Sequence, residues 1–477
     1  MPRRPIRVTG VPEGPLRAAL TALRAEPGIP AGFPPEVLAE AERAARDPVL
    51  PAEDATDIPF ATVGPPASTD LDQAFHLSRQ GTGYRVRYAV ADVAAFVAPG
   101  GALDAEAHRR VMTLYFPDAK IPLHPPVLSE GAAGLLPGQT RPAVLWTIDL
   151  DADGSPLAVD LRRALVRSRA RLDHAGVQRE LDSGTAEEPL ALLRTVGRLR
   201  EALEADRGGI SLNVPEQEIT EHDHAYGLAY RAPLPAEGFD AQLSLLTGMA
   251  AADLMLSSGT GVLRTLPAAP DGAVGRLRRT ATALRVDWPH HVSYAALVRS
   301  LDPREPRHAA FLQECTALLR GAGCTVFRDF ALPEITTHSA VAAPYAHCTA
   351  PLRRLADRYA TEICLAVAAG RPVPEEVLAA LDALPERMAD GGRRAATVER
   401  ACVDIVEAAL LKDRIGEVFD ACVIDLAEHR PTTGTVHLES PAVVGRVDGD
   451  GLLLGERLRV RLTEADPGVA KVRFVPA

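Results

Sequence analysis

Residues 60–77 read FATVGPPASTDLDQAFHL, in which two segments of alternating apolar and polar residues flank a Pro-rich loop. Such alternation is typical of half-buried strands. Asp70 and Asp72 are two residues apart, so both carboxylates point to the same side of an extended backbone. Neighbouring carboxylates repel each other unless a cation lies between them, and Mg²⁺ prefers oxygen ligands. The pair therefore indicates a metal site that orients a phosphodiester and activates water, although D-x-D is also common in turns.

The β pattern extends from about residue 57 to 165, and apolar residues at helical spacing follow it. After Gly416 about five short strands with Gly-rich turns occupy the end of the chain. This ending predicts an OB-type barrel, a fold that commonly binds oligonucleotides, and a barrel without a ligand is the alternative. The expected fold class is α+β.

The first 50 residues predict two short helices, at 14–25 and 34–46, separated by a stretch rich in Pro and Gly. We expect these helices to pack together as a hairpin. A helix-turn-helix that binds nucleic acid is the alternative, but no basic or aromatic residues mark a recognition helix.

The composition is that of an ordinary globular protein of two to four domains: 477 residues, 47% hydrophobic and 24% charged. No apolar stretch is long enough to cross a membrane or to serve as a secretion signal, so we expect a cytoplasmic protein. The net charge of −11 excludes a protein that coats nucleic acid by bulk attraction, and any such site must be a local channel. The six cysteines lack zinc-site spacing and predict reduced, mostly buried thiols.

A second candidate segment, residues 345–366, reads YAHCTAPLRRLADRYATEICLA. Its Thr-Ala-Pro sequence predicts the start of a helix that carries Arg353, Arg354 and Arg358. Guanidinium groups at this place can fork onto a phosphate. The alternative is a capped helix whose arginines form salt bridges.

Taken in this order, the segments resemble the RNB catalytic domain of the ribonuclease II/R family. The matching stretches are residues 60–77, residues 88–135 and the segment TAPLRRLADR, and the C-terminal barrel resembles an S1 RNA-binding domain. The resemblance divides the chain into a helical segment at 1–50, a mixed α/β RNB domain at 51–410 and an S1-like OB-fold domain at 411–477.

The family resemblance implies an exoribonuclease that degrades single-stranded RNA processively from its 3′ end, and we expect a monomer. It implies Mg²⁺ as cofactor, nucleoside 5′-monophosphates as products and a channel too narrow for duplex RNA. The residues that match the family's catalytic positions are Asp70, Asp72 and Arg353, and its metal positions fall on Asp70, Asp72 and Gln73. The implied RNA-binding positions are Tyr115, Leu212, Arg354 and Glu399.

The sequence departs from the family pattern at three of these places. The first of four expected aspartates is Gly64 and the fourth is Gln73, so two formal charges are missing from the cluster and Mg²⁺ affinity should fall. Leu212 stands where a phenylalanine is usual, which removes one stacking partner for a base. A catalytically impaired RNA-binding protein of the same fold is therefore the alternative function.

Overall fold

The computed structural model describes most of the chain. The described residues are 6–9, 14–26, 28–30, 32–65, 68–214, 216–222, 225–319, 321–427, 430–438, 441, 443–469 and 471–477.

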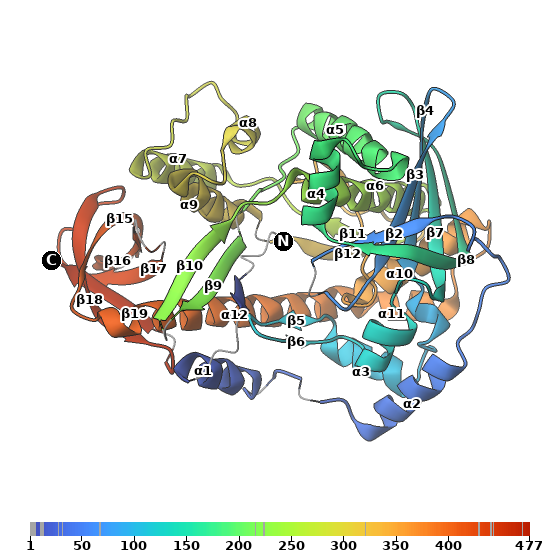
Figure 1. Ribbon diagram of the computed structural model, residues 1–477, viewed down its shortest axis with the longest axis horizontal. Helices are drawn as coiled ribbons and strands as arrows, with labels where there is room; N and C mark the ends of the chain where they lie inside the picture. The colour runs from blue at the N-terminus through green and yellow to red at the C-terminus, as the bar shows by residue number, and fades with distance from the viewer. Residues whose placement is uncertain are drawn as a thin grey trace.

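The β-rich part that the sequence predicts forms a closed five-stranded barrel (Figure 1), with strand order β2-β3-β4-β7-β8. Its strands are β2 (Phe60–Val63), β3 (Gln73–Gln80), β4 (Gly83–Ala91), β7 (Thr140–Leu150) and β8 (Pro156–Leu172). Neighbouring strands are antiparallel except β2 and β8, which close the barrel in parallel. Tyr88 and Trp146, which pair across β4 and β7, are both buried.

Helices pack against this barrel and complete the larger hydrophobic core. The helix α6 contains few polar residues and is buried over much of its length, which fits a helix that is enclosed on several sides. The helices around the barrel are α4 (His174–Ser183), α5 (Glu188–Arg207), α6 (Pro235–Ser258), α10 (Leu355–Ala368) and α11 (Glu375–Leu381).

A second closed barrel of five strands lies at the C-terminal end, with order β15-β16-β17-β19-β18. Its strands are β15 (Val418–Ala427), β16 (Arg430–Leu438), β17 (Val444–Asp448), β18 (Arg457–Asp466) and β19 (Lys471–Pro476). Figure 1 shows the 28-residue helix α12 (Leu384–Leu411) running from one barrel to the other. At 1.5 Å per residue this helix is about 42 Å long.

The two predicted N-terminal helices are present as α1 (Pro15–Arg24) and α2 (Pro35–Arg46), but the expected hairpin between them is wrong. Helix α1 packs on α12, while α2 packs on α3 (Ala102–Arg110) and the short helix η2 (Val127–Ala132). The apolar faces of α1 and α2 belong to different hydrophobic clusters, so each helix is held by a different part of the chain.

The remaining elements connect these parts. A three-stranded sheet contains β1 (Ile6–Thr9), β9 (Glu216–His222) and β10 (Ala225–Arg231). A small helical cluster contains α7 (Asp271–Ala283), α8 (Tyr294–Ser300) and α9 (Pro306–Cys315). Short paired strands are β5 (Leu114–Tyr115) with β6 (Lys120–Ile121), β11 (Gly261–Thr265) with β12 (Gly323–Phe327), and β13 (Thr337–His338) with β14 (Ala343–Pro344). Short single turns of helix are η1 (Val93–Ala95), η3 (Thr316–Leu319) and η4 (Lys412–Arg414).

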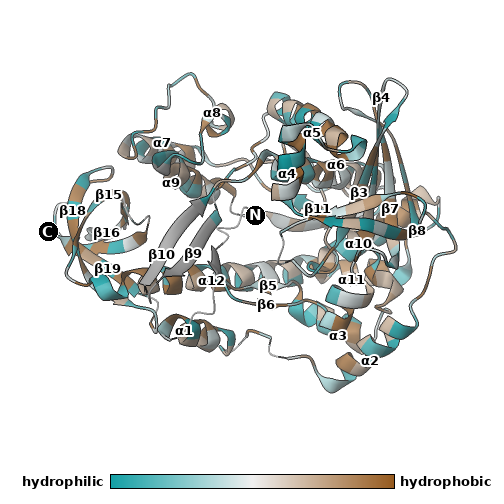
Figure 2. Ribbon diagram, in the orientation of Figure 1, coloured by the Kyte–Doolittle hydropathy of each residue, from teal (hydrophilic) through white to brown (hydrophobic). Residues whose placement is uncertain are grey.

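The structure confirms the predicted α+β class with a C-terminal OB-like barrel. Figure 2 shows that the peripheral helices mix hydrophilic and hydrophobic residues, as amphipathic helices on a core do. All six cysteines are free, and all but Cys324 are buried, as predicted. Within the described residues, no helix is both long enough and apolar enough to span a membrane.

Candidate active site

The loop between β2 and β3 opens onto a cavity of about 710 Å³, which we call the Asp72 cavity. The first barrel supplies one wall through this loop, and the β5–β6 hairpin and the segment before α10 supply others. The lining residues that matter below are Gly64, Asp70, Asp72, Gln73, Tyr115, Lys120, His174, Asp240 and Arg353. The structure therefore gathers into one place residues that lie up to 289 positions apart in the sequence.

Asp72 is the most enclosed carboxylate of the cavity, with 4% of its surface exposed. One carboxylate oxygen accepts a hydrogen bond from the backbone N–H of Leu352 at 2.8 Å, and the other accepts one from Nε of Arg353 at 2.8 Å. Burial raises the pKa of Asp72 to about 6, although Arg353 and the Leu352 amide favour the ionised form. The cavity thus contains a carboxylate that takes up a proton close to neutral pH.

Arg353 is held at one nitrogen and accessible at the others. Its side chain is 38% exposed, and among the described residues only its Nε donates a hydrogen bond. Burial opposes the charge of the guanidinium, but the Asp72 carboxylate outweighs this effect and raises the pKa of Arg353. Arg353 therefore presents a positive charge that the Asp72 carboxylate holds in place through Nε.

The predicted helix start at Thr349-Ala-Pro is wrong, because α10 begins at Leu355. Of the three arginines that the sequence places on this helix, only Arg358 is helical. Before the helix, the backbone N–H of Ala350 donates to Asp357 and that of Leu352 donates to Asp72, and both carboxylates are buried. Both amides therefore hold buried carboxylates beside the start of α10.

Arg354 points to a different partner from its neighbour. Its guanidinium forms two hydrogen bonds with Asp357, at 3.0 and 2.8 Å, and Asp357 is completely buried. Arg354 does not line the Asp72 cavity. In this structure its contacts are those of a clamp on the start of α10, and its role in RNA binding remains a prediction.

Asp70 lies in the same cavity but faces a lysine. Nζ of Lys120 donates to Oδ1 of Asp70 at 2.9 Å and to Oγ1 of Thr69 at 2.9 Å, and it lies 3.1 Å from Oε1 of Glu130. Burial alone would lower the pKa of Lys120, but its contacts with Asp70 and Glu130 outweigh burial and raise the pKa. The Asp70 carboxylate therefore already has an ammonium partner, which it shares with Glu130.

The positions that would coordinate a divalent cation either form hydrogen bonds within the protein or have no side chain. Gln73 accepts the hydroxyl of Tyr88 at its carbonyl oxygen and donates its amide group to the backbone oxygen of Thr349 at 2.7 Å. Gly64 contributes no side chain, and a Cβ at this position would meet open space. Among the described residues, no group of three or more His, Cys, Asp or Glu side chains is arranged to hold a metal ion. The residues as placed therefore do not fit a divalent metal.

The other predicted RNA-binding residues are only partly brought together. Tyr115 lines the Asp72 cavity, with its hydroxyl 3.5 Å from Oδ2 of Asp70. Leu212 lines a separate cavity of about 200 Å³ and packs against the α7–α9 cluster. Glu399 lies on α12 and contributes, with Asp118, to the negative environment of Cys402. Neither Leu212 nor Glu399 lines the Asp72 cavity, so the structure does not bring these two residues to Asp72.

Sequence reasoning missed five polar residues of the cavity: Ser68, Asp118, Lys120, His174 and Asp240. Nε2 of His174, at the start of α4, lies 3.4 Å from Oδ2 of Asp240 on α6. Nothing in the local sequence pairs these two residues, since 66 positions separate them. A signal for Lys120 does exist, because it is one of only three lysines in the chain, the others being Lys412 and Lys471.

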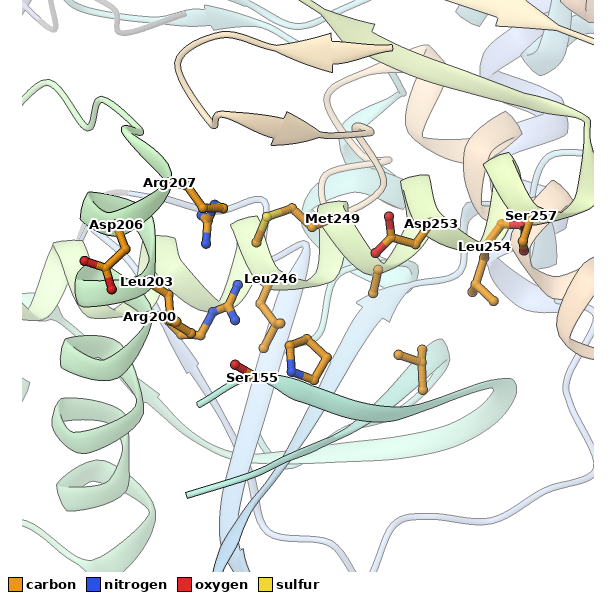
Figure 3. Close-up of a pocket in the computed structure, with 13 residues that line it drawn as sticks. Ser155, Arg200, Leu203, Asp206, Arg207, Leu246, Met249, Asp253, Leu254 and Ser257 are labelled. Atoms are coloured by element: carbon orange, nitrogen blue, oxygen red, sulfur yellow. Dashed lines mark hydrogen bonds between the residues drawn. The ribbon is translucent and has the colours of Figure 1, made fainter. Parts of the chain in front are cut away.

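A second cavity, of about 650 Å³, lies between α5, α6 and the turn that joins β7 to β8. Figure 3 shows the guanidinium groups of Arg200 and Arg207 beside Leu246 and Met249 in this cavity. Arg200 is 3% exposed and donates to the carbonyl oxygen of Gly154 at 3.0 Å, which holds the turn against α5. This cavity shares no lining residue with the Asp72 cavity, so the predicted chemistry belongs to the first cavity.

Comparisons with known proteins agree with this geometry. Residues 52–369 match the RNB domain, and residues 417–477 match the RNase II-type exonuclease C-terminal S1 domain. The chain is similar to Ribonuclease R of Aquifex aeolicus, with 25% identity over 94% of this chain and 68% of that protein. In overall fold it is similar to Mycoplasma genitalium RNase R in complex with ribose methylated single-stranded RNA. The TM-score is 0.82 at 19% identity, and the match covers 97% of this chain and 78% of the other.

A further solved structure with the same fold is yeast Ssd1, described as a pseudonuclease, with a TM-score of 0.68 at 14% identity. That match covers 96% of this chain and 58% of the other. Nucleases of the RNB family are generally metal-dependent, whereas no group of three or more described His, Cys, Asp or Glu side chains in this chain is arranged to hold a metal ion. The RNB match covers well over half of the sequence and its C-terminal partner domain follows in order, so the chain belongs to the RNB family of exoribonucleases.

Proposed function

We propose that this protein binds single-stranded RNA, receives its 3′ end in the Asp72 cavity and removes nucleotides processively in the 3′ to 5′ direction as nucleoside 5′-monophosphates. The observation that carries the proposal is the buried Asp72 carboxylate, held by Arg353 and the Leu352 amide in a cavity that Tyr115 also lines. A base, a fixed cation and an aromatic ring are the parts that hydrolysis of a stacked terminal nucleotide needs.

Asp72, Arg353 and Tyr115 each have a separate role in the proposed reaction. Asp72, with a pKa of about 6, accepts a proton from an attacking water molecule near neutral pH. The water oxygen bonds to phosphorus, the bond from phosphorus to the 3′ oxygen of the preceding nucleotide breaks, and that oxygen takes up a proton from solvent. The terminal nitrogens of Arg353 stabilise the charge that develops on the phosphoryl oxygens. Tyr115 stacks on the terminal base.

Mg²⁺ is the cofactor that the family resemblance implies, but this proposal assigns it no step. Gly64 and the hydrogen bonds of Gln73 leave two of the four family positions without an available ligand, and Lys120 already neutralises Asp70. The requirement for Mg²⁺ is therefore measured in the same assay that tests for activity.

The RNA upstream of the cavity is expected to bind the C-terminal barrel. Strand β18 carries Arg457, Arg459 and Arg461 at alternate positions, and all three side chains are exposed. Alternate residues lie on one face of a strand, so this face presents a row of positive charge to a phosphate backbone. An acidic chain with a net charge of −11 can hold RNA in this way only through such local features.

The test is incubation of the purified protein with a 5′-labelled single-stranded RNA of about 30 nucleotides, which exceeds the footprint expected of one binding groove. The assay is run with Mg²⁺ and with EDTA, and end products are resolved on a gel. Asp72→Asn should slow shortening by about 10²–10⁴-fold, because the general base is lost, while RNA affinity changes little. Asp160→Asn, an exposed position on β8, is the matched control and should retain full activity. Undiminished shortening by Asp72→Asn would falsify the assignment.

A second candidate function is RNA binding without hydrolysis. The hydrogen bonds of Gln73 and Asp70 within the protein favour it, because they occupy atoms that would otherwise coordinate a metal ion. In that case intact RNA remains after incubation, although binding is measurable. The double variant Gly64→Asp with Gln73→Asp then restores two carboxylates, and open space beside Gly64 accommodates one of them. Mg²⁺-dependent shortening by the double variant alone identifies a protein whose catalysis has been lost by substitution.

A further inference from the structure

Lys120 is an exceptional residue in this chain. Of the 52 basic residues, 49 are arginines, and one of the three lysines lies in the Asp72 cavity. Its side chain is 20% exposed, so the ammonium group is largely removed from water. Lysine differs from arginine in that its charge is compact, like that of a metal ion, whereas a guanidinium is a broad planar fork.

The surroundings of this ammonium group resemble those of a bound cation. Three oxygens surround Nζ at 2.9 to 3.1 Å: carboxylate oxygens of Asp70 and Glu130, and the hydroxyl oxygen of Thr69. Hard cations such as Mg²⁺ are held by oxygen ligands of these kinds. Here the protein's own amino group occupies the centre of that oxygen set.

The hairpin that carries Lys120 keeps it in place. Lys120 opens β6 and pairs with Tyr115 across the β5–β6 hairpin. The hairpin contacts α12, and Phe116, which follows β5, is buried in the cluster that joins α1, α12 and the second barrel. The lysine is thus attached to a packed element and is not on a free loop.

The charges of the cavity show what this ammonium group changes. Four carboxylates line the cavity, those of Asp70, Asp72, Asp118 and Asp240, and the Glu130 carboxylate also contacts Lys120, whereas Arg353 is the only arginine of the lining among the described residues. Without Lys120 these groups would repel an RNA phosphate unless a metal ion were present. Lys120 lowers the excess negative charge of the cavity by one unit, and the neutral Thr69 hydroxyl is the partner that a phosphate oxygen can most readily replace.

We propose that Lys120 is a tethered cation that replaces a divalent metal at Asp70, so that the 3′-terminal phosphates of RNA bind in the Asp72 cavity without a metal ion. This inference rests on the proposed binding of RNA, but the effect of Lys120 on metal binding can be measured in the absence of RNA. Two measurements, one with RNA and one with Mn²⁺ alone, separate a failure of this inference from a failure of the proposed function.

The RNA measurement compares the full-length protein with Lys120→Met, which keeps the length of the side chain and removes its charge. Affinity for a single-stranded RNA of about 30 nucleotides is measured by fluorescence anisotropy in EDTA and in Mg²⁺. The unaltered protein should bind equally well in both buffers, whereas Lys120→Met should bind about tenfold more weakly in EDTA, the size of one lost charged hydrogen bond. Lys412→Met is the matched control, because it removes a lysine of η4, outside both the Asp72 cavity and the strands of the second barrel, and it should lose no more than about threefold.

The metal measurement uses Mn²⁺ alone, followed by the loss of its free electron paramagnetic resonance signal. The unaltered protein should bind no Mn²⁺, and Lys120→Met should gain one site with a dissociation constant on the order of 0.1–1 mM, a range found for weak carboxylate sites. Circular dichroism spectra confirm that the variant is folded. A merely structural salt bridge predicts no gain of metal binding.

Three results would overturn the proposal. One is an Mn²⁺ site in the unaltered protein that Lys120→Met leaves unchanged, and another is a loss of RNA affinity in EDTA by the unaltered protein. The third is a Lys120→Met variant that gains no Mn²⁺ site. If no RNA binds under any condition, the proposed function fails, and the Mn²⁺ titration still decides the role of Lys120.

Discussion

The two closed barrels of this chain have the same number of strands but differ in what covers them. In the first barrel, the loop before β3 is covered by a segment from nearly 280 positions later, and Asp72 is 4% exposed as a result. In the second barrel, the arginines of β18 remain exposed. Burial raises the pKa of a carboxylate and strengthens its local charge interactions, whereas exposure suits reversible contacts with a phosphate backbone. The comparison shows that the segment packed over the loop, more than the barrel itself, gives Asp72 the burial and the charge contacts that a catalytic carboxylate needs.

The largest expected effects are on stability and come from substitutions in the hydrophobic cores of the two barrels. Trp146 in the first barrel and Phe474 in the second are both 0% exposed, and no hydrophobic cluster of the described residues contains side chains from both barrels. Trp146→Ala and Phe474→Ala should each lower the free energy of unfolding by about 3–5 kcal/mol, through lost burial and the cavity left behind.

Differential scanning calorimetry checks this expectation. Because the cores are separate, each variant should shift one of two transitions and leave the other in place. Equal shifts of a single transition by both variants would instead show that α12 joins the barrels into one cooperative unit.

A smaller effect should follow from the exposed arginines of the second barrel. Replacing Arg457, Arg459 and Arg461 with alanine should weaken RNA binding by about tenfold at low salt and reduce its salt dependence, because phosphate contacts are lost. The rate of shortening at saturating RNA should stay the same, since the Asp72 cavity is untouched. These substitutions are preferable to deletion of the barrel, which would expose the apolar face of α12.

A binding titration at two salt concentrations and a single-turnover assay provide the two readouts. A fall in turnover at saturating RNA would mean that the second barrel does more than hold the substrate. Unchanged RNA affinity would show that the RNA upstream of the cavity does not bind the arginines of β18.

The smallest effect is a pH dependence of RNA shortening. The pKa of Asp72 is raised to about 6, so the ionised form that accepts a proton is present above this pH and is lost as the pH falls through it. The rate should therefore fall to half near pH 6, and an unshifted aspartate would give this midpoint near 4. A rate profile between about pH 3 and about pH 8 brackets both midpoints and distinguishes them. A midpoint near 4 would contradict the role of burial at Asp72.

Local patterns in the sequence were enough for much of the fold. Alternating residues predict the strands on either side of Asp70 and Asp72, helical spacing predicts α4 to α6, and Gly-rich turns predict the five strands of the second barrel. These features depend on near neighbours in the chain. The same reasoning failed for the N-terminal helices, because the partner of each helix is set by distant apolar surfaces and not by the other helix.

The sequence by itself determined which chemical groups are available: the Asp70 and Asp72 pair, the missing carboxylates at Gly64 and Gln73, and the scarcity of lysine. The tertiary structure alone decided how they are used. It joins Asp72 to Arg353 across 281 positions and places Lys120 against Asp70. The physical reason is that electrostatic contacts depend on distance and burial in space, and neither can be read from spacing along the chain.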